Sequence, residues 1–183
     1  MLYIGIDTGV HTGVAIWDTK TQMFLSIECL KIHVVMRMVE SLLACNKGNV
    51  VIRFEDARQR NWFGTAGREH LQGAGSIKRD CTIWEDFLTD LHARFEAIPP
   101  RKNITKISAE AFERITGWKD RTNEHERDAA MLVFQAQPTI REIIDNQKLK
   151  KNEIRKTTDH NEAHAPDGAH RKGDMGGLPR RRR

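Results

Sequence analysis

The alternation of apolar and polar residues predicts three short strands within the first 30 positions. The first two cover residues 2–6 and 12–17, and the third runs from Met23 to Ile27. Short connections rich in Gly, Asp and Thr separate them, which is typical of an antiparallel meander. We therefore expect the chain to begin with three strands paired in sequence order.

Beyond the meander, the apolar spacing predicts helices that alternate with further strands. Residues 33–45 carry apolar side chains at helical spacing, and residues 50–54, which are apolar apart from Arg53, predict a buried strand. A further helix is expected from about Arg79 to Phe95, ended by Pro99-Pro100. The next strand is expected at residues 104–107.

Two shorter helices complete the predicted order. Ser108 would begin one that runs to about Ile115 and is closed by Thr116-Gly117. Asn123 would cap the last, which carries the apolar residues 129–134. The order β-β-β-α-β-α-β-α-α predicts an α/β domain, with helices packed on a mixed sheet.

Residues 56–79 lack an apolar period, and four glycines interrupt them. The basic and aromatic residues of this stretch are Arg58, Arg60, Arg68, Lys78 and Arg79, together with Trp62 and Phe63. A loop of this length inside a compact domain is usually functional. The alternative is a solvated charged excursion whose aromatic rings fold back onto the domain.

Charge divides the chain unevenly. Residues 147–183 hold 11 Lys/Arg and 5 Asp/Glu, a net charge of +6, whereas residues 1–146 hold 19 and 20, a net charge of −1. Apolar residues nearly vanish from Asn146 onward, which predicts a disordered basic tail over residues 146–183. The overall charge of +5 is thus a property of the tail and does not by itself indicate a nucleic-acid-binding domain.

Composition excludes several classes of protein. No apolar run reaches the roughly 20 residues that a membrane helix needs. The first residues lack the layout of a signal peptide, so we expect a cytoplasmic location without membrane contact. The odd number and wide spacing of Cys29, Cys45 and Cys81 argue against structural zinc and a disulfide framework, and predict buried reduced thiols.

Two strand-end carboxylates and one helical pair are the candidate chemical groups. Asp7 ends the first strand and Glu55 ends the most apolar one, whereas Asp56 points to the opposite face. On the last helix, His125 and Asp128 are three residues apart and share a face. Taken singly, each has an ordinary explanation: a turn aspartate, a glutamate emerging into solvent, acids at a helix start.

Together these residues would form a pocket of hard oxygen ligands. Mg²⁺ prefers a few carboxylates and retains waters for substrate phosphate. Two such ions about 4 Å apart can activate a water molecule and stabilise the leaving oxygen of a phosphodiester. The combination therefore points to phosphodiester chemistry.

Several motifs resemble the RuvC-type Holliday junction resolvases of the RNase H-like superfamily over about residues 1–137. They are Ile4-Gly5-Ile6-Asp7-Thr8-Gly9 with Thr12-Gly13-Val14-Ala15, Phe54-Glu55, Gly73-Ala74-Gly75-Ser76, Ile115-Thr116-Gly117 and His125-Glu126-Arg127-Asp128-Ala129-Ala130. The resemblance implies an RNase H-like mixed five-stranded sheet flanked by helices over residues 1–145. It also implies an endonuclease that uses Mg²⁺, or Mn²⁺ in its place, at Asp7, Glu55, His125 and Asp128. Residues 56–71 and the tail do not match the family pattern.

The same resemblance implies branched DNA as the substrate and a homodimer that makes two symmetric cuts. Candidate DNA-binding residues are Arg58, Arg60, Trp62, Phe63, Arg68, Lys78, Arg79 and Lys119, with Lys78 at the scissile phosphate and Trp62 or Phe63 stacking on an opened base. The helix around Ile83, Trp84 and Phe87 is the expected dimer interface.

Other functions are compatible with parts of the pattern. An actin-like or sugar-kinase-type ATP-binding domain shares the strand-turn-strand opening, but 183 residues are too few for the two domains that enclose the nucleotide. An RNase H-like nuclease could act on a flap or an R-loop instead. A nucleic-acid binder without catalysis would not need all four candidate ligands.

Overall fold

A computed structural model describes residues 1–59 and 68–162. The strands are β1 (Leu2–Asp7), β2 (His11–Asp18), β3 (Met23–Lys31), β4 (Val50–Glu55) and β5 (Phe95–Ile98). The helices are α1 (Ile32–Cys45), α2 (Arg68–Asp90), α3 (Ala109–Thr116), α4 (Glu124–Met131) and α5 (Ile140–Glu162), with short 3-10 turns η1 (Ala57–Gln59) and η2 (Pro100–Lys102). Contacts group residues 1–146 into one compact unit.

The five strands form one mixed sheet in the order β3-β2-β1-β4-β5. Strand β2 runs antiparallel to β1 and β3, whereas β4 is parallel to β1, and β5 is parallel to β4. The predicted α/β class and mixed five-stranded sheet are confirmed.

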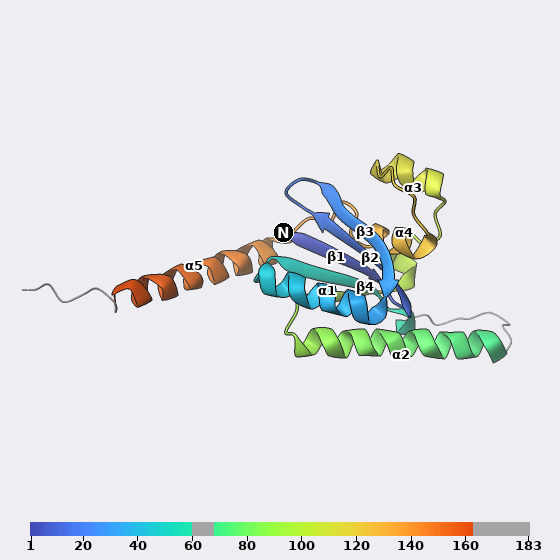
Figure 1. Ribbon diagram of the computed structural model, residues 1–183, viewed down its shortest axis with the longest axis horizontal. Helices are drawn as coiled ribbons and strands as arrows, with labels where there is room; N and C mark the ends of the chain where they lie inside the picture. Colours follow the sequence, from blue (N-terminus) through green and yellow to red (C-terminus); the bar gives the residue numbers. More distant parts are fainter. Residues whose placement is uncertain (60–67, 163–183) are drawn as a thin grey trace, which may run out of the picture. The chain divides into compact units, whose positions relative to one another are not determined.

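Helices cover both faces of the sheet, and each face has its own apolar core (Figure 1). Ile4 and Ile6 of β1 pack on α1 and α2, together with the fully buried Trp84. Tyr3, the alternate residue of β1, packs on the other face with α4 and with Phe112 of α3. Because side chains alternate along a strand, Asp7 continues the α4 face.

Glycine allows α4 to lie directly on the sheet. A Cβ atom on Gly5 would overlap the carbonyl oxygen of Ala129, and one on Gly13 would overlap the carbonyl oxygen of His125. Gly13 is also the cross-strand partner of Asp7. The two glycines thus bring the start of α4 over the end of β1.

The predicted element order is confirmed as far as α4, but the bounds of two elements were wrong. The helix expected from Arg79 begins at Arg68, and it ends at Asp90. Phe95 belongs to β5, which is the strand that Pro99 and Pro100 follow. Residues 104–107 are irregular and are not a strand, with Lys106 in a left-handed conformation (φ 58°).

The end of the described chain also differs from the prediction. Disorder is expected from residue 146, yet α5 is helical from Ile140 to Glu162. Its first turn is fixed by a hydrogen bond that the Tyr3 hydroxyl donates to the Glu142 carboxylate, at 3.0 Å. The rest of the predicted tail, residues 163–183, lies outside the described residues. No helix in the described part of the chain is long and apolar enough to cross a membrane.

Two smaller predictions need correction. Cys81 is buried as expected, but Cys29 is half-buried and Cys45 is exposed. Of the predicted dimer interface, Trp84 is buried in the core of its own chain and Phe87 is half-buried, whereas Ile83 is exposed. Helix packing explains the second result, because the predicted apolar stripe of α2 faces the sheet.

Candidate active site

The ends of two parallel strands bring the first two candidate carboxylates together. Ile6 of β1 is paired with Phe54 of β4, so the next residues, Asp7 and Glu55, end neighbouring strands at the same edge of the sheet. Both continue the sheet face that α4 covers. The strand register therefore places these two carboxylates side by side, as their sequence positions indicate.

Helix α4 adds the imidazole. Its start is fixed by a reciprocal capping box, in which Asn123 and Glu126 each accept a hydrogen bond from the other's backbone N–H. One residue into the helix, the His125 Nδ1 atom lies 2.7 Å from the Asp7 Oδ2 atom. The Asp7 side chain is 17% exposed and that of His125 is 45% exposed, so the pair opens to solvent through the imidazole.

The segment between η2 and α3 contacts the other two carboxylate residues. The Asn103 Nδ2 group donates to Glu55 Oε2 at 3.1 Å and to the Asp128 carbonyl oxygen at 3.3 Å. The Lys106 backbone N–H donates to Asp128 Oδ1 at 2.8 Å. Glu55 and Asp128 are thus connected through one short segment, residues 103–106.

Asp7 is the electrostatic centre of this cluster. Burial raises the pKa of Asp7 to about 6, even though its hydrogen bond with His125 acts in the opposite direction. The negative charges of Glu55 and Asp128 add to the increase. Burial also raises the pKa of Asp128, against the hydrogen bond from Lys106. Carboxylates with raised pKa values beside like charges are typical of functional sites.

The cluster suits a divalent cation in the chemistry of its ligands. Three carboxylates and an imidazole are ligands that Mg²⁺ or Mn²⁺ accepts, and a cation would relieve the repulsion around Asp7. Each carboxylate is engaged through one oxygen, by His125, by Asn103 or by Lys106. As they stand, no three His, Cys, Asp or Glu side chains among the described residues are close enough to hold an ion. Metal binding would therefore draw the carboxylates toward one another.

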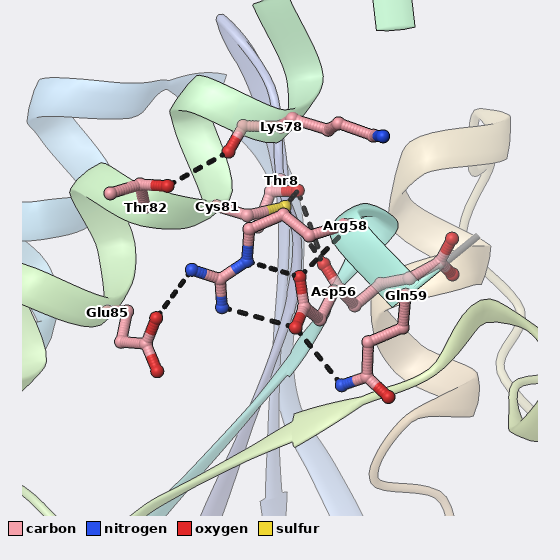
Figure 2. Close-up of polar contacts among 9 residues, drawn as sticks. Thr8, Asp56, Arg58, Gln59, Lys78, Cys81, Thr82 and Glu85 are labelled. Carbon is pink, nitrogen blue, oxygen red and sulfur yellow. Dashed lines mark hydrogen bonds and ion pairs between the residues drawn. The ribbon is translucent and has the colours of Figure 1, made fainter. Parts of the chain in front are cut away.

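Asp56 points to the opposite face, as predicted, and lies in a different environment. It is buried and accepts hydrogen bonds from Arg58 (2.7 Å) and Gln59 (3.0 Å), while Arg58 also contacts Glu85 (2.5 Å) (Figure 2). Burial alone would raise the pKa of Asp56, but these hydrogen bonds hold it below its usual value. Arg58 therefore balances the negative charge of Asp56 within the protein, as in an ion pair that stabilises a fold.

The main chain at Glu55 is supported from two further elements. The Thr8 hydroxyl donates to the Glu55 carbonyl oxygen at 3.4 Å and lies 3.3 Å from the Cys81 thiol (Figure 2). Cys81 of α2 also contacts that carbonyl, at 3.5 Å. Thr8, which directly follows β1, and Cys81 of α2 therefore hold the main chain at the end of β4 in place.

Three of the predicted DNA-binding residues form ion pairs with acidic neighbours. Arg58 is occupied by Asp56 and Glu85, Arg79 pairs with Asp80 at 3.1 Å, and Lys119 pairs with Glu113 at 2.7 Å. The Lys78 side chain is half-buried on α2 and extends away from the Asp56 cluster (Figure 2). Arg60, Trp62 and Phe63, and the side chain of Arg68, lie outside the described part of the structure.

Sequence reasoning missed Asn103 and Lys106, both of which contact the candidate ligands. Neither lies in a periodic segment, and the pattern of residues 104–107 indicates a strand instead. The one signal available is the position of Asn103, shortly after Pro99-Pro100, where an irregular connection is typical.

No family model matches the sequence, and a search of curated proteins finds no match. Among solved structures, T. thermophilus RuvC in complex with Holliday junction substrate is similar to this chain. The two share 16% identity with a TM-score of 0.48, and the match covers 74% of this chain and 92% of the other. At that level of similarity, neither residue roles nor a substrate carry over to this chain.

Proposed function

We propose that this protein is a metal-dependent endonuclease with its active site at Asp7, Glu55, His125 and Asp128. The observation that supports the proposal is the 2.7 Å contact between Asp7 and His125 at the end of β1, where burial and the charges of Glu55 and Asp128 raise the pKa of Asp7 to about 6. Asp7 is paired with the His125 imidazole, at 2.7 Å. Partly buried carboxylates that lie near one another repel when they are ionised, and a bound divalent cation would offset that repulsion.

In this proposal Asp7, Glu55 and Asp128 hold Mg²⁺, and His125 binds at the rim. The bound ion would polarise a phosphodiester and favour ionisation of the attacking water. Asp7 must be ionised to bind the ion, so metal-dependent activity should rise with pH through about 6. His125 extends from the site toward solvent and is positioned to accept a proton from the attacking water or to orient it.

Branched DNA is the substrate that we propose, on the strength of the sequence motifs. The segments around Asp7, Glu55 and the His125–Asp128 pair resemble RuvC-type resolvases in type and order. Two symmetric cuts in a four-way junction require two sites, so we also propose a homodimer. On the described part of α2, Ile77 and Ile83 are exposed and Phe87 is half-buried, so these apolar residues are the candidates for that interface.

A cleavage assay tests the proposal. The purified protein is incubated with a synthetic four-way junction, a linear duplex of the same arm sequences and a single strand, each with Mg²⁺, Mn²⁺ or EDTA. We expect nicks in the junction with either metal and none in EDTA. Equal cleavage of the linear duplex would reject branch specificity, while cleavage that persists in EDTA would reject the metal-dependent site.

A further inference from the structure

One short segment, residues 103–106, contacts both Glu55 and Asp128, although these belong to different elements. Glu55 ends β4 and Asp128 lies on α4. The segment approaches Glu55 with the Asn103 amide (3.1 Å) and Asp128 with the Lys106 backbone N–H (2.8 Å). A change in this segment would therefore alter the two carboxylates together.

The Asn103 amide has a defined orientation. Its Nδ2 group donates to two acceptors, the Glu55 carboxylate and the Asp128 carbonyl oxygen. A rotated amide would turn its oxygen toward two other oxygens, which repel it. The Oδ1 atom is buried and has no hydrogen-bond partner among the described residues. Such an atom usually costs free energy, so the donor side of the amide decides the conformation.

The backbone conformation of Lys106 adds a second cost in free energy to the same segment. Its φ of 58° is in the left-handed region, which residues other than glycine and asparagine rarely adopt. In this conformation its N–H points to Asp128 Oδ1. Strain of this kind is maintained where the surroundings fix the backbone, and it is frequent at functional sites.

The donors of this segment are neutral. A Lys or Arg side chain at the same place would neutralise the carboxylates and compete with a bound cation. An amide and a backbone N–H orient the carboxylates and leave their negative charge intact. Residues 103–106 combine these neutral donors with the backbone conformation that directs the Lys106 N–H to Asp128.

We infer that Asn103, supported by Lys106, is a positioning residue that prepares Glu55 and Asp128 for a divalent cation. The inference rests on the proposed function, since it requires that the carboxylates bind a metal. Asn103 acts through the Glu55 carboxylate and the Asp128 main-chain carbonyl, and it is not assigned a contact with substrate. Residues that orient metal ligands typically change metal affinity or activity by about 10- to 100-fold when removed.

The test is calorimetric titration of Mn²⁺ into the full-length protein without DNA. Asn103→Leu keeps the branched shape and the number of side-chain heavy atoms and removes the donor, while Asn103→Ser keeps a hydroxyl too short to reach both acceptors. Asn49→Ala is the matched control, because the Asn49 amide donates to the Lys47 carbonyl oxygen at the opposite end of β4. Melting in EDTA shows that each variant is folded.

We expect Asn103→Leu and Asn103→Ser to weaken Mn²⁺ binding by about 10- to 100-fold, and Asn49→Ala to leave it unchanged. If the wild-type protein binds Mn²⁺ and folded Asn103 variants bind it equally well, the positioning role is wrong and the proposed function stands. If the wild-type protein binds no Mn²⁺, the proposed function fails, and this inference fails with it. Should Asn103→Leu not fold, the Asn103→Ser titration alone decides between the first two results.

Discussion

Glu55 and Asp56 are adjacent in sequence, but their side chains lie on opposite faces of the sheet and have different electrostatic surroundings. Asp56 is directed to the α2 side, where Arg58 and Gln59 satisfy it and hold its pKa low. Glu55 is directed to the α4 side, where Asp7 and Asp128 are its charged neighbours and a neutral amide is its donor. Arg58 balances the charge of Asp56, whereas burial and the neighbouring carboxylates raise the pKa of Asp7 in the other cluster.

The comparison separates a structural acid from a candidate functional one by electrostatics. A carboxylate whose partners lower its pKa stabilises the fold when it is ionised. Burial and like charges raise the pKa of Asp7, so its ionised form destabilises the folded state until a cation binds. Active sites commonly carry such a cost in stability.

Of the predicted effects, the largest comes from a substitution that moves α4 away from the sheet. Gly13→Ala would push the new Cβ against the His125 backbone, so we expect a loss of about 3 kcal/mol or more in unfolding free energy. Metal binding should be lost as well, because His125 and Asp128 move with the helix. Urea unfolding and Mn²⁺ titration measure the two effects.

Gly75→Ala is the control for Gly13→Ala. Gly75 lies in α2, and a Cβ atom at this position would have open space around it, so alanine should stabilise the protein by about 0.5–1 kcal/mol. A Gly13→Ala protein as stable as the wild type would show that α4 does not depend on this close approach.

Asp7→Asn should stabilise the metal-free protein at neutral pH. The Asp7 pKa rises from 3.8 in the unfolded chain to about 6, so the wild type loses stability as the pH rises between these values. The difference corresponds to about 3 kcal/mol at most. Unfolding in EDTA at pH 4 and pH 7.5 should show a gain for Asp7→Asn at pH 7.5 that nearly disappears at pH 4. A loss at pH 7.5 would show that Asp7 is satisfied without metal.

Asp56→Asn should destabilise the protein at neutral pH, which is the opposite of the effect expected for Asp7→Asn. Its lowered pKa means that ionised Asp56 contributes stability above its unfolded pKa, and that this contribution is lost as the pH falls. Replacing a charged hydrogen-bond acceptor for Arg58 should cost about 2 kcal/mol near pH 7. The same pair of unfolding measurements checks this, and a variant with wild-type stability would remove the contrast between the two acids.

The smallest effect concerns the basic C-terminal residues. Residues 147–183 carry a net charge of +6, so we expect them to add sequence-independent affinity for DNA. Their deletion should weaken junction binding at low salt and make the log-log salt dependence shallower, by about 0.9 in slope for every phosphate that these residues neutralise on duplex DNA. Single-turnover cleavage at saturating protein should persist, because the proposed site lies within residues 1–146. An unchanged salt slope after deletion would show that the C-terminal residues do not bind DNA.

The part of the site that lies on regular elements is predictable from the sequence. Asp7 and Glu55 follow apolar strands, and Asp128 begins an apolar helical stripe, so periodicity places all three on a sheet edge or a helix face. The topology that brings the two strands together follows from the motif resemblance. Strand β5 is misplaced by the same reasoning, because its four residues come directly after a helical pattern that the sequence extends to Phe95.

The remaining features depend on contacts that no local pattern encodes. The sequence does not predict the start of α2 because glycines occupy positions 73 and 75, and glycine disfavours a helix unless the rest of the segment supports it. The role of Gly13 as a contact surface for α4 depends on a segment more than 100 residues away. The Asn103 and Lys106 contacts arise from an irregular segment, where spacing carries no information on direction.

The most direct measurement is single-turnover cleavage of one four-way junction by three proteins: wild type, Asp7→Asn and Asp56→Asn, with Mg²⁺ at a temperature where all three are folded. We predict that Asp7→Asn binds the junction and loses cleavage by more than the roughly 100-fold typical of residues outside the ligand shell. Asp56→Asn should cleave at nearly the wild-type rate. Wild-type cleavage by Asp7→Asn, or an equal loss in both variants, would contradict the assignment of the active site to the α4 face of the sheet.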